Sequence, residues 1–342
     1  MIDLLTTIEY GGCSAKLSAK ELDALLVNFP VLKNENILID NTLHDDAGVY
    51  KISDSLAIIF TTDFFPPICS DPYMFGKIAA ANSLSDIYAM GGEPFLALNI
   101  NMYPSTLPLD GLSEILRGGN DKAIEAGTAI LGGHTIEDAV PKYGLAVIGK
   151  VDPHHIIVNS GLKAGQKLIL TKRIGTGAIQ AAQRVGLASN NDIEQMLTSM
   201  STLNANAMRI LLKYNPTGGT DITGFGLAGH CYRMALASHV SLEIESSSIP
   251  YFECARNIYD QGCIPGATFR NKEFVGNNIH FNILLTYEEK ALIFDPQTSG
   301  GLLFGVNHEN ADAALVDLKC QGIDAWIIGS VIPLKDKYIY VK

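Results

Sequence analysis

Short apolar runs, each with the length and composition of a β-strand, mark the first half of the chain. They cover residues 56–60, 95–102, 128–133 and 143–151. Longer stretches between them, at 75–90 and 109–126, are typical of helices. This succession predicts a mixed α and β domain built on a largely buried sheet, and we place this domain at residues 36–153.

A polar, turn-rich stretch at 152–166 interrupts the pattern, as a linker or a long surface connection would. A second series of strand-like and helix-like stretches begins after it, so we expect a C-terminal α+β domain at 154–342. Its expected strands are 167–171, 241–245, 281–287, 325–331 and 338–342, and its expected helices are 177–186, 191–214, 225–238, 250–262 and 309–321.

Residues 1–35 precede both domains, and we expect a mobile active-site segment there, followed by a helix. The segment is "YGGCSAKLS", which puts Cys13 beside two glycines and three residues before Lys16. The helix is "SAKELDALLVNF", in which Ser18 and Glu21 have the spacing of a capping box.

Composition narrows the possible functions. The 342 residues carry a net charge of −11 without a basic run, which argues against a nucleic-acid surface. No stretch approaches 18 uninterrupted apolar residues, and the acidic start does not resemble a signal peptide, so we expect neither a membrane span nor export. Six scattered cysteines without CxxC pairs indicate a reducing, cytoplasmic compartment.

Aspartates stand at four separated places where neither solvent nor core packing explains them easily. Asp45 and Asp46 enter a small apolar run in "HDDAGVY", although a solvated turn would explain this pair equally well. Asp63 ends an apolar strand and meets two phenylalanines, a costly position for a carboxylate unless it is paired or holds a metal.

The other two places lie near glycines. Asn82 and Asp86 share one helix face among small residues, where Asp86 would otherwise serve as a buried cap of a loop. Asp221 lies in the loop "TGGTDITGFG" just before a helix, where backbone N–H groups can cradle phosphate oxygens. Carboxylates without a His and Cys cluster favour Mg²⁺ over zinc.

Other glycine-rich pieces indicate phosphate binding more weakly. Gly132, Gly133 and His134 follow an apolar strand that we expect to be buried. "KRIGTGAIQAA" is a shortened GxGxxG with Gln180 where the third glycine belongs, so it favours a Rossmann site only weakly. "DPQTSGG" alone would be a tight structural turn, and no P-loop occurs.

In order, the motifs "GGCSAK", "HDDAGVY", "TTDFFPP", "AANSLSDIYAMGG", "GGHTIED", "TDITGFGLAGH", "PGATFRN" and "DPQTSGG" closely resemble the selenophosphate synthetase (selenide, water dikinase) family. This family lies within the aminoimidazole ribonucleotide synthetase-like superfamily. The resemblance implies a two-domain α+β fold whose N-terminal sheets pair in a homodimer. It also implies that ATP, selenide and water give selenophosphate, AMP and orthophosphate, with Mg²⁺ required.

The resemblance also assigns roles to residues. It makes Cys13 the nucleophilic or selenium-handling group and Lys16 a catalytic contact to the ATP phosphates. Asp46, Asp86 and Asp221 fall on the magnesium ligands of the family. Its ATP contacts fall on Lys16, Leu43, His44, Asp45, Asp63, Asp86, Gly132, Gly133 and His134. Other members commonly have Thr and Arg in place of Leu43 and His44, so we expect backbone contacts there.

Our hypothesis for the N-terminal segment is that it closes over ATP, with Lys16 neutralising phosphate charge and Cys13 guiding selenide. Ala15 stands where some members carry a second cysteine, which argues against a local disulfide. Two alternatives remain: an ADP-forming small-molecule kinase of the same superfamily, which needs no Cys13, and an ATP-dependent selenium carrier without turnover. A selenide-delivering partner protein is also possible.

Overall fold

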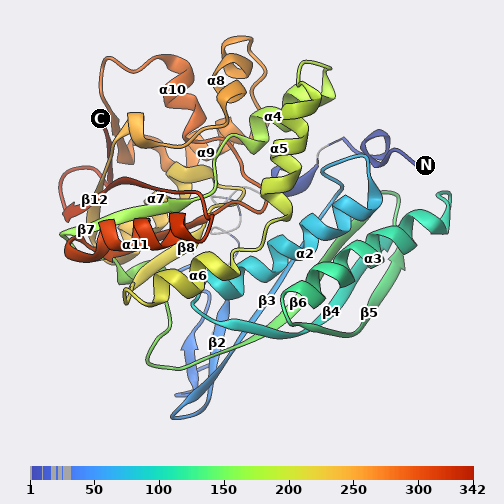
Figure 1. Ribbon diagram of the computed structural model, residues 1–342, viewed down its shortest axis with the longest axis horizontal. Coiled ribbons are helices and arrows are strands. Elements are labelled where there is room, and N and C mark those ends of the chain that lie inside the picture. The colour runs from blue at the N-terminus through green and yellow to red at the C-terminus, as the bar shows by residue number, and fades with distance from the viewer. Residues whose placement is uncertain (1, 10, 17–20, 22–24, 26–31) are drawn as a thin grey trace.

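The computed structural model describes residues 2–9, 11–16, 21, 25 and 32–342, and it contains two β-sheets with helices packed around them (Figure 1). This architecture confirms the predicted α+β class. The helix expected over 18–29, with Ser18 as its cap, falls mainly outside the described residues. The short 3₁₀ helices are η1 (Leu4–Thr7), η2 (Gly12–Ala15), η3 (Asn159–Gly161), η4 (Ser246–Ser248) and η5 (Gly276–Asn278).

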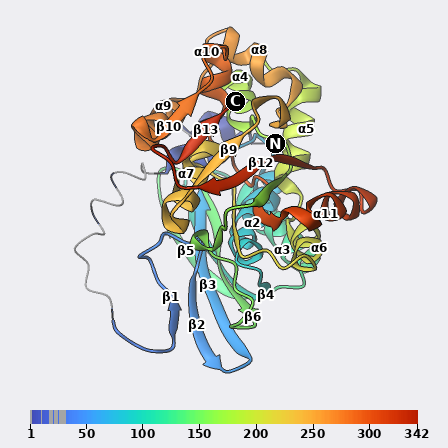
Figure 2. The same ribbon diagram turned by 90° about the vertical axis from the view of Figure 1, so that its left-hand side faces the viewer.

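The N-terminal sheet has six strands in the order β1-β2-β3-β6-β4-β5. All neighbours are antiparallel except β4 and β5. In Figure 2 the long strands β2 and β3 run down one side of the molecule. The strands are β1 (Ile37–Ile39), β2 (Gly48–Ser53), β3 (Leu56–Phe65), β4 (Glu93–Tyr103), β5 (Ala129–Glu137) and β6 (Lys142–Val151).

Two helices, α2 (Pro72–Ala89) and α3 (Leu109–Glu125), lie side by side over one face of this sheet (Figure 1). Asp71 caps α2, because its side chain accepts a hydrogen bond from the N–H of Met74 at 2.6 Å. The helices approach closely at Gly76, where a Cβ atom would collide with the backbone of Ile115. Alternate residues of β3 are exposed, so the other face of the sheet is uncovered.

The C-terminal sheet has seven strands in the order β10-β13-β9-β12-β7-β11-β8. Its strands are β7 (Gln166–Thr171), β8 (Gly218–Asp221), β9 (Val240–Ile244), β10 (Ile279–Phe281), β11 (Leu302–Asn307), β12 (Ala325–Pro333) and β13 (Ile339–Val341). Its helices are α4 (Thr176–Arg184), α5 (Asn190–Ser201), α6 (Ala205–Leu212), α7 (Gly226–Ser238), α8 (Glu253–Asp260), α9 (Gly266–Val275), α10 (Tyr287–Leu292) and α11 (His308–Cys320).

The single helix expected over 191–214 is wrong, because α5 ends at Ser201 and α6 begins at Ala205. Thr202 takes an extended backbone conformation (φ −80°, ψ 127°). The side chain of Asn204 bonds Ser85 and Gly300 at 2.8 and 2.9 Å, which fixes the break against other parts of the chain. Periodicity alone did not reveal a break held by tertiary contacts.

The strand expected over 281–287 is also wrong, because β10 ends at Phe281 and a turn leads into α10. Thr286 and Glu289 form a capping box that starts this helix. Ile283 and Leu284 caused the error, since both are apolar yet 90% and 84% exposed. A strand interior would have buried one of them.

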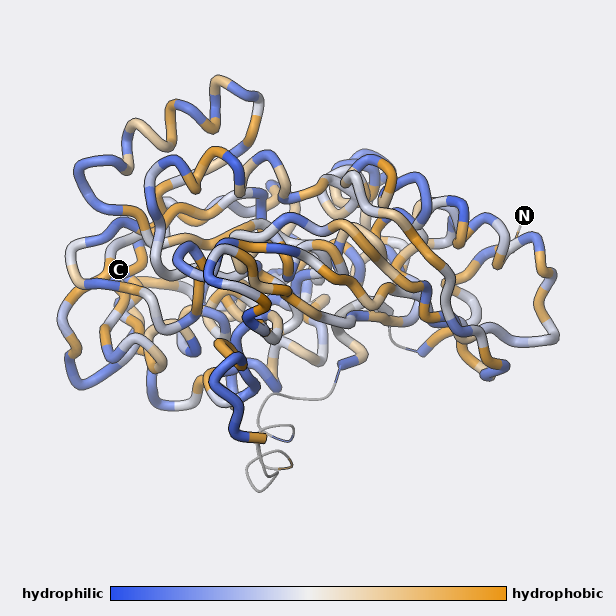
Figure 3. Tube along the Cα trace, turned by 90° about the horizontal axis from the view of Figure 1, so that it is seen from below, coloured by the Kyte–Doolittle hydropathy of each residue, from blue (hydrophilic) through white to orange (hydrophobic). Residues whose placement is uncertain are grey.

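Helix α2 connects the two domains, because it contacts α5, α6 and β8 as well as its own sheet. A connection of residues 152–165 runs from β6 to β7, and the predicted boundary at 153/154 falls within it. Along the outermost helices in Figure 3, orange and blue segments alternate, as expected for helices with one buried face. Among the described helices, none combines the length and apolarity needed to cross a membrane.

Candidate active site

A cavity of about 310 Å³ lies between the two domains and gathers most of the aspartates singled out above. We call it the aspartate cleft. Strand β3, helix α2 and the loop before β2 line it from the N-terminal domain, while β8 and α7 line it from the other side. Its lining residues are Lys16, Asn41, His44, Asp45, Asp46, Thr61, Thr62, Asp63, Asp86, Asn159, Thr220, Asp221, Thr223, Phe225, His230 and Arg233.

The alternation of β3 places two polar side chains on its helix-covered face, Thr61 and Asp63. This strand continues to Phe65, beyond the expected end at residue 60. The Thr61 hydroxyl donates to Asp86 Oδ2 at 2.6 Å, and Asn82 Nδ2 donates to Asp63 Oδ2 at 2.6 Å. The strand and α2 therefore hold each other's functional side chains in place.

Asp45, Asp46 and Asp221 each keep one carboxylate oxygen buried without a hydrogen-bond partner in the described part of the chain. Their other contacts fix them in place: the N–H of Asn159 donates to Asp45 Oδ1 at 2.6 Å, and the Thr220 hydroxyl donates to Asp46 Oδ1 at 2.8 Å. Buried anionic oxygens without partners are costly, so the cleft is suited to a bound cation.

Burial and mutual repulsion raise the pKa values of these carboxyl groups. Burial raises the pKa of Asp46 and of Asp86 well above the usual range, and the nearby Asp221 carboxylate raises both further. Burial raises the pKa of Asp221 itself to about 6, against hydrogen bonding from Ser85 and the charge of Lys16. Burial also raises the pKa of Asp45. A cation would relieve this repulsion.

Within the described residues, no three His, Cys, Asp or Glu side chains form a complete metal site by themselves. Mg²⁺ does not require one, because it keeps several waters and is often held by one or two carboxylates together with substrate phosphates. The unpartnered oxygens of Asp46 and Asp221, in a cleft whose described lining is rich in carboxylates and contains no sulfur ligand, therefore fit Mg²⁺ bound jointly by protein and nucleotide.

Lys16 lies at the cleft and pairs with Asp63, with Nζ 2.7 Å from Oδ2. Its segment is docked against both domains. The N–H of Gly12 donates to the carbonyl of Pro66 at 3.0 Å, and Gly12 has a φ of +58° that favours glycine. A Cβ atom here would collide with Ile68 and Thr298.

Arg184, the last residue of α4, binds the chain just before this segment. It donates to the carbonyls of Glu9 and Ile8. Cys13 belongs to η2, but its side chain lies outside what the structure describes. The backbone thus places Cys13 three residues from Lys16, at the junction of the two domains.

His230 is a structural partner rather than a base, in line with its position in a helix. Its Nε2 accepts a hydrogen bond from the N–H of Thr223 at 3.1 Å. Burial lowers its pKa to about 3, so the ring is neutral at pH 7.

The structure does not bring every expected residue to this cleft. Leu43 is 45% exposed and does not line it, and His44 takes part through its backbone, whose carbonyl accepts a hydrogen bond from Asn159 Nδ2. Gly132, Gly133 and His134 lie on β5, an exposed edge strand, so the expectation of a buried strand there is wrong. With three strand spacings separating β5 from β3, they are about 14 Å away in the sheet.

Residues that sequence reasoning missed also shape the cleft. Asn159 is only 3% exposed, although it lies in the connection expected to be a linker or surface segment. Its N–H and its side-chain amide hold Asp45 and His44. No local signal marks such a residue, because its partners are more than a hundred positions away.

The other glycine-rich pieces bind each other. Gln297 Oε1 accepts the N–H groups of Gly175 and Thr176, and Asp295 Oδ2 accepts that of Gly177 at 3.0 Å. Side chains of "DPQTSGG" therefore occupy the N-terminus of α4. In the described structure this turn therefore fixes α4 within the C-terminal domain. Because the first N–H groups of α4 are already bonded, a phosphate site at this helix end is disfavoured.

Comparison with known proteins identifies the class of this fold and site. Residues 44–151 match the AIR synthase related protein, N-terminal domain, and residues 163–342 match the AIR synthase related protein, C-terminal domain. The crystal structure of thiamine-monophosphate kinase from Stenotrophomonas maltophilia aligns with a TM-score of 0.67 and 15% identity over 96% of both chains. At that identity it shows a shared fold only.

Closer relatives narrow the class. A selenide, water dikinase of Porphyromonas gingivalis is 49% identical over 98% of this chain and 96% of its own. A selenide, water dikinase of Treponema denticola is also 49% identical, over 94% of this chain and 90% of its own. The chain belongs to the selenide, water dikinase family.

Proposed function

We propose that this protein is an ATP-dependent enzyme that makes selenophosphate from selenide and water, releasing AMP and orthophosphate. Near-full-length similarity to selenide, water dikinases carries the proposal. The aspartate cleft supports it, because buried carboxylates with unpartnered oxygens provide a place where a cation can meet nucleotide phosphates.

We assign Mg²⁺ to Asp46, Asp86 and Asp221 together with the nucleotide phosphates and water, so that one or two carboxylates at a time suffice for each ion. When bound, Mg²⁺ would offset the charge of ATP, which carries about four negative charges. Thr61, Thr220 and Ser85 would keep the three carboxylates oriented, since each donates to one of them.

Lys16 and Cys13 complete the site from the N-terminal segment. Lys16 now pairs with Asp63, and in the nucleotide complex it would turn its charge to the phosphates. Cys13 would guide selenide, as a thiolate favoured by the nearby lysine. Closure of the segment would limit simple hydrolysis of ATP by keeping bulk water out.

We further propose a homodimer formed through the uncovered face of the N-terminal sheet. This face and its edge carry large exposed apolar side chains, a pattern typical of an interaction surface. They are Tyr50, Phe60, Phe64, Leu98, Leu131 and Ile136. A second copy packed there would explain why Gly132–His134 lie apart from the aspartate cleft, since they would be free to reach nucleotide bound by the other subunit.

Phosphorus NMR of the protein with ATP, selenide and Mg²⁺ tests the activity. We expect resonances of selenophosphate, AMP and orthophosphate. ADP without selenophosphate would instead indicate the related small-molecule kinase, and unchanged ATP would indicate a selenium carrier.

Cys13→Ser tests the role of the thiol, with the exposed Cys320→Ser as the matched control. We expect Cys13→Ser alone to abolish selenophosphate formation while ATP binding persists. Full activity of Cys13→Ser would remove the assigned role. The cytoplasmic location and a selenide-delivering partner stay predictions.

A further inference from the structure

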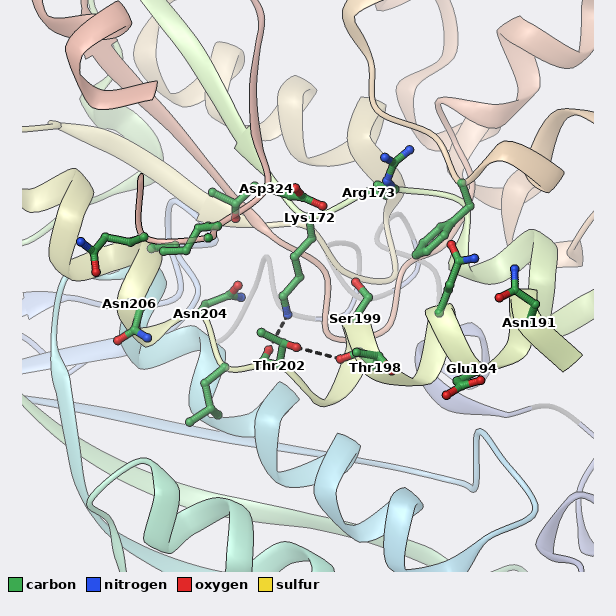
Figure 4. Close-up of a pocket in the computed structure, with 18 residues that line it drawn as sticks. Lys172, Arg173, Asn191, Glu194, Thr198, Ser199, Thr202, Asn204, Asn206 and Asp324 are labelled. Atoms are coloured by element: carbon green, nitrogen blue, oxygen red, sulfur yellow. Dashed lines mark hydrogen bonds between the residues drawn. The ribbon is translucent and has the colours of Figure 1, made fainter. Parts of the chain in front are cut away.

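A second, larger cavity of about 750 Å³ lies between β7, α5, α6 and the loop before β12 (Figure 4). We call it the lysine cavity. None of the family motifs quoted above accounts for it. Its volume falls within the usual range for small-molecule sites.

Lys172 is the central charged group of this cavity. In Figure 4 its side chain points toward Thr202, between Asn204 and Ser199. Its Nζ donates to the carbonyls of Thr202 and Ser299 at 2.7 and 2.9 Å. An ammonium has three N–H donors, so in the described structure one is left for a ligand.

The surroundings of Lys172 suit a phosphate group. Thr198 and Ser199 supply hydroxyl groups, while the Thr202 hydroxyl donates to the carbonyl of Thr198 at 2.8 Å. Arg173 lies at the edge of the cavity, where it donates to the carbonyl of Tyr251. Helix α6 begins here at Ala205, and no side chain caps it, so its first N–H groups are available to an anion.

The remainder of the cavity suits the other end of an elongated molecule. From Ser199, α5 carries the lining to Asn191, about 12 Å at 1.5 Å per residue. This is far longer than a single phosphate. Asn191, Glu194 and Gln195 offer amide groups and a carboxylate, which accept hydrogen bonds from hydroxyl or amino groups.

We propose that the lysine cavity is a second ligand site that binds a nucleoside monophosphate, with the phosphate at Lys172 and the sugar and base along α5. The proposal rests on the proposed function, because AMP is the nucleoside monophosphate that the reaction releases. It adds a regulatory site to that function, separate from the aspartate cleft.

Two chains of hydrogen bonds link this site to the aspartate cleft. Ser299, whose carbonyl binds Lys172, donates its N–H to Asn82 Oδ1 at 2.9 Å, and Asn82 in turn holds Asp63. Asn204 binds Ser85, which hydrogen-bonds Asp221. AMP at Lys172 would therefore shift groups that hold the aspartates, so the enzyme can sense its product.

Ionisation of Lys172 makes the binding pH-dependent. Burial lowers its pKa to about 7, against the opposing charge of Asp221 and with help from Lys122. Arg173, Glu194 and Asp324 are the other charged groups that line the cavity. A phosphate favours the charged amine, so AMP affinity should fall as pH rises above about 7.

A crystal of the full chain soaked in 8-bromo-AMP locates the site without any variant. We expect the anomalous bromine signal in the lysine cavity and the phosphate beside Lys172. Bromine only at the aspartate cleft, or at neither place, would overturn the proposal.

Titration calorimetry measures the binding in solution, without Mg²⁺, so that the proposed metal site stays empty. We expect Lys172→Met to weaken AMP binding at least tenfold, whereas Lys163→Met, at an exposed lysine of the same domain, leaves it unchanged. Equal affinity in the two variants contradicts the proposal.

Adenosine and inorganic phosphate serve as separate arms of this titration. Both should bind more weakly than AMP. Phosphate binding as tightly as AMP would contradict the nucleoside part. Failure of the proposed function would look different, because wild-type protein would then form no selenophosphate whatever binds at Lys172.

Discussion

The aspartate cleft between the domains and the lysine cavity within the C-terminal domain differ in charge, so they attract ligands of opposite sign. The aspartate cleft holds buried carboxylates with unpartnered oxygens, so it calls for a cation. The lysine cavity is centred on an amine with a donor to spare, so it calls for an anion. In both cavities a bound ligand would neutralise charge that the protein itself leaves uncompensated. Removing one of these charged side chains should therefore raise the stability of the ligand-free protein and lower its activity or ligand affinity.

The largest effect should follow from removing one charge of the cleft. Asp221→Asn should lower selenophosphate formation by roughly a thousandfold, since it weakens the metal that neutralises the phosphates. It should also raise the melting temperature of the ligand-free protein by about 2–4 °C, because it removes about 1 kcal/mol of repulsion.

Activity assays and thermal unfolding of the same samples check this pair of outcomes. Asp312→Asn, at an exposed position of α11, is the control and should change neither quantity. A destabilised Asp221→Asn protein would show that the cleft is not strained by its own charge.

Removing the hydrogen bonds that link the two cavities should have the next largest effect. Asn82→Ala removes the amide donor to Asp63 Oδ2, which then keeps Lys16, and it takes away the acceptor of the Ser299 N–H. We expect a loss of roughly a hundredfold in kcat from misplaced phosphate contacts, and a smaller loss of AMP affinity at Lys172. Steady-state kinetics and calorimetry measure the two, with the exposed Asn257→Ala as control. If only one site responds, the cavities are independent.

Arg184 offers a change that should reach one cavity alone. Arg184→Ala removes the bonds to Ile8 and Glu9, so the segment that carries Cys13 and Lys16 is held less firmly. We expect selenophosphate formation to fall about three- to tenfold, as befits hydrogen bonds of an exposed arginine, with AMP affinity unchanged. Arg184→Lys should recover part of the activity, because an ammonium can still donate to one of the two carbonyls. Recovery should be incomplete, because an ammonium lacks the planar pair of donors of a guanidinium. Equal effects on both sites would mean that Arg184 acts through the fold as a whole.

The smallest effect is a pair of opposite pH dependences. The pKa of Asp221 rises from 3.8 to about 6 on folding, so its stabilising contribution is complete below 3.8 and is lost as pH rises through about 6. The pKa of Lys172 falls from 10.5 to about 7, so its contribution is complete above 10.5 and is lost as pH falls through about 7.

Thermal unfolding from pH 5 to 9 can separate the two contributions. Asp221→Asn should flatten the loss of stability as pH rises from 5 toward 6, and Lys172→Met the loss as pH falls from 9 toward 7. Unchanged profiles would show that neither group differs in ionisation between the folded and unfolded states.

The sequence predicted correctly those helices and strands that are specified by residues close to one another along the chain. Apolar runs predicted β3 and β4, and small residues around Asn82 and Asp86 predicted a helix with a functional face, which is α2. The break before α6 escaped prediction because Asn204 is held by Ser85, more than a hundred positions away.

The same limit applies to the sites. The aspartates could be picked out because buried carboxylates next to apolar runs are unusual in any sequence. Lys172 directly follows the apolar strand 167–171, and its local sequence does not predict the cavity that it lines. In the described structure its amine donates to the carbonyls of Thr202 and Ser299, which are distant in sequence and hold it toward the cavity.

One turn of α2, from Asn82 to Asp86, touches both cavities. Asn82 and Asp86 serve the aspartate cleft, while Ser85 reaches the lysine cavity through Asn204. A substitution in this turn should therefore change both the reaction rate at the aspartate cleft and the binding of AMP in the lysine cavity. Substitutions that abolish AMP binding without lowering the catalytic rate should therefore be sought on α5, which lines the lysine cavity, and not in this turn.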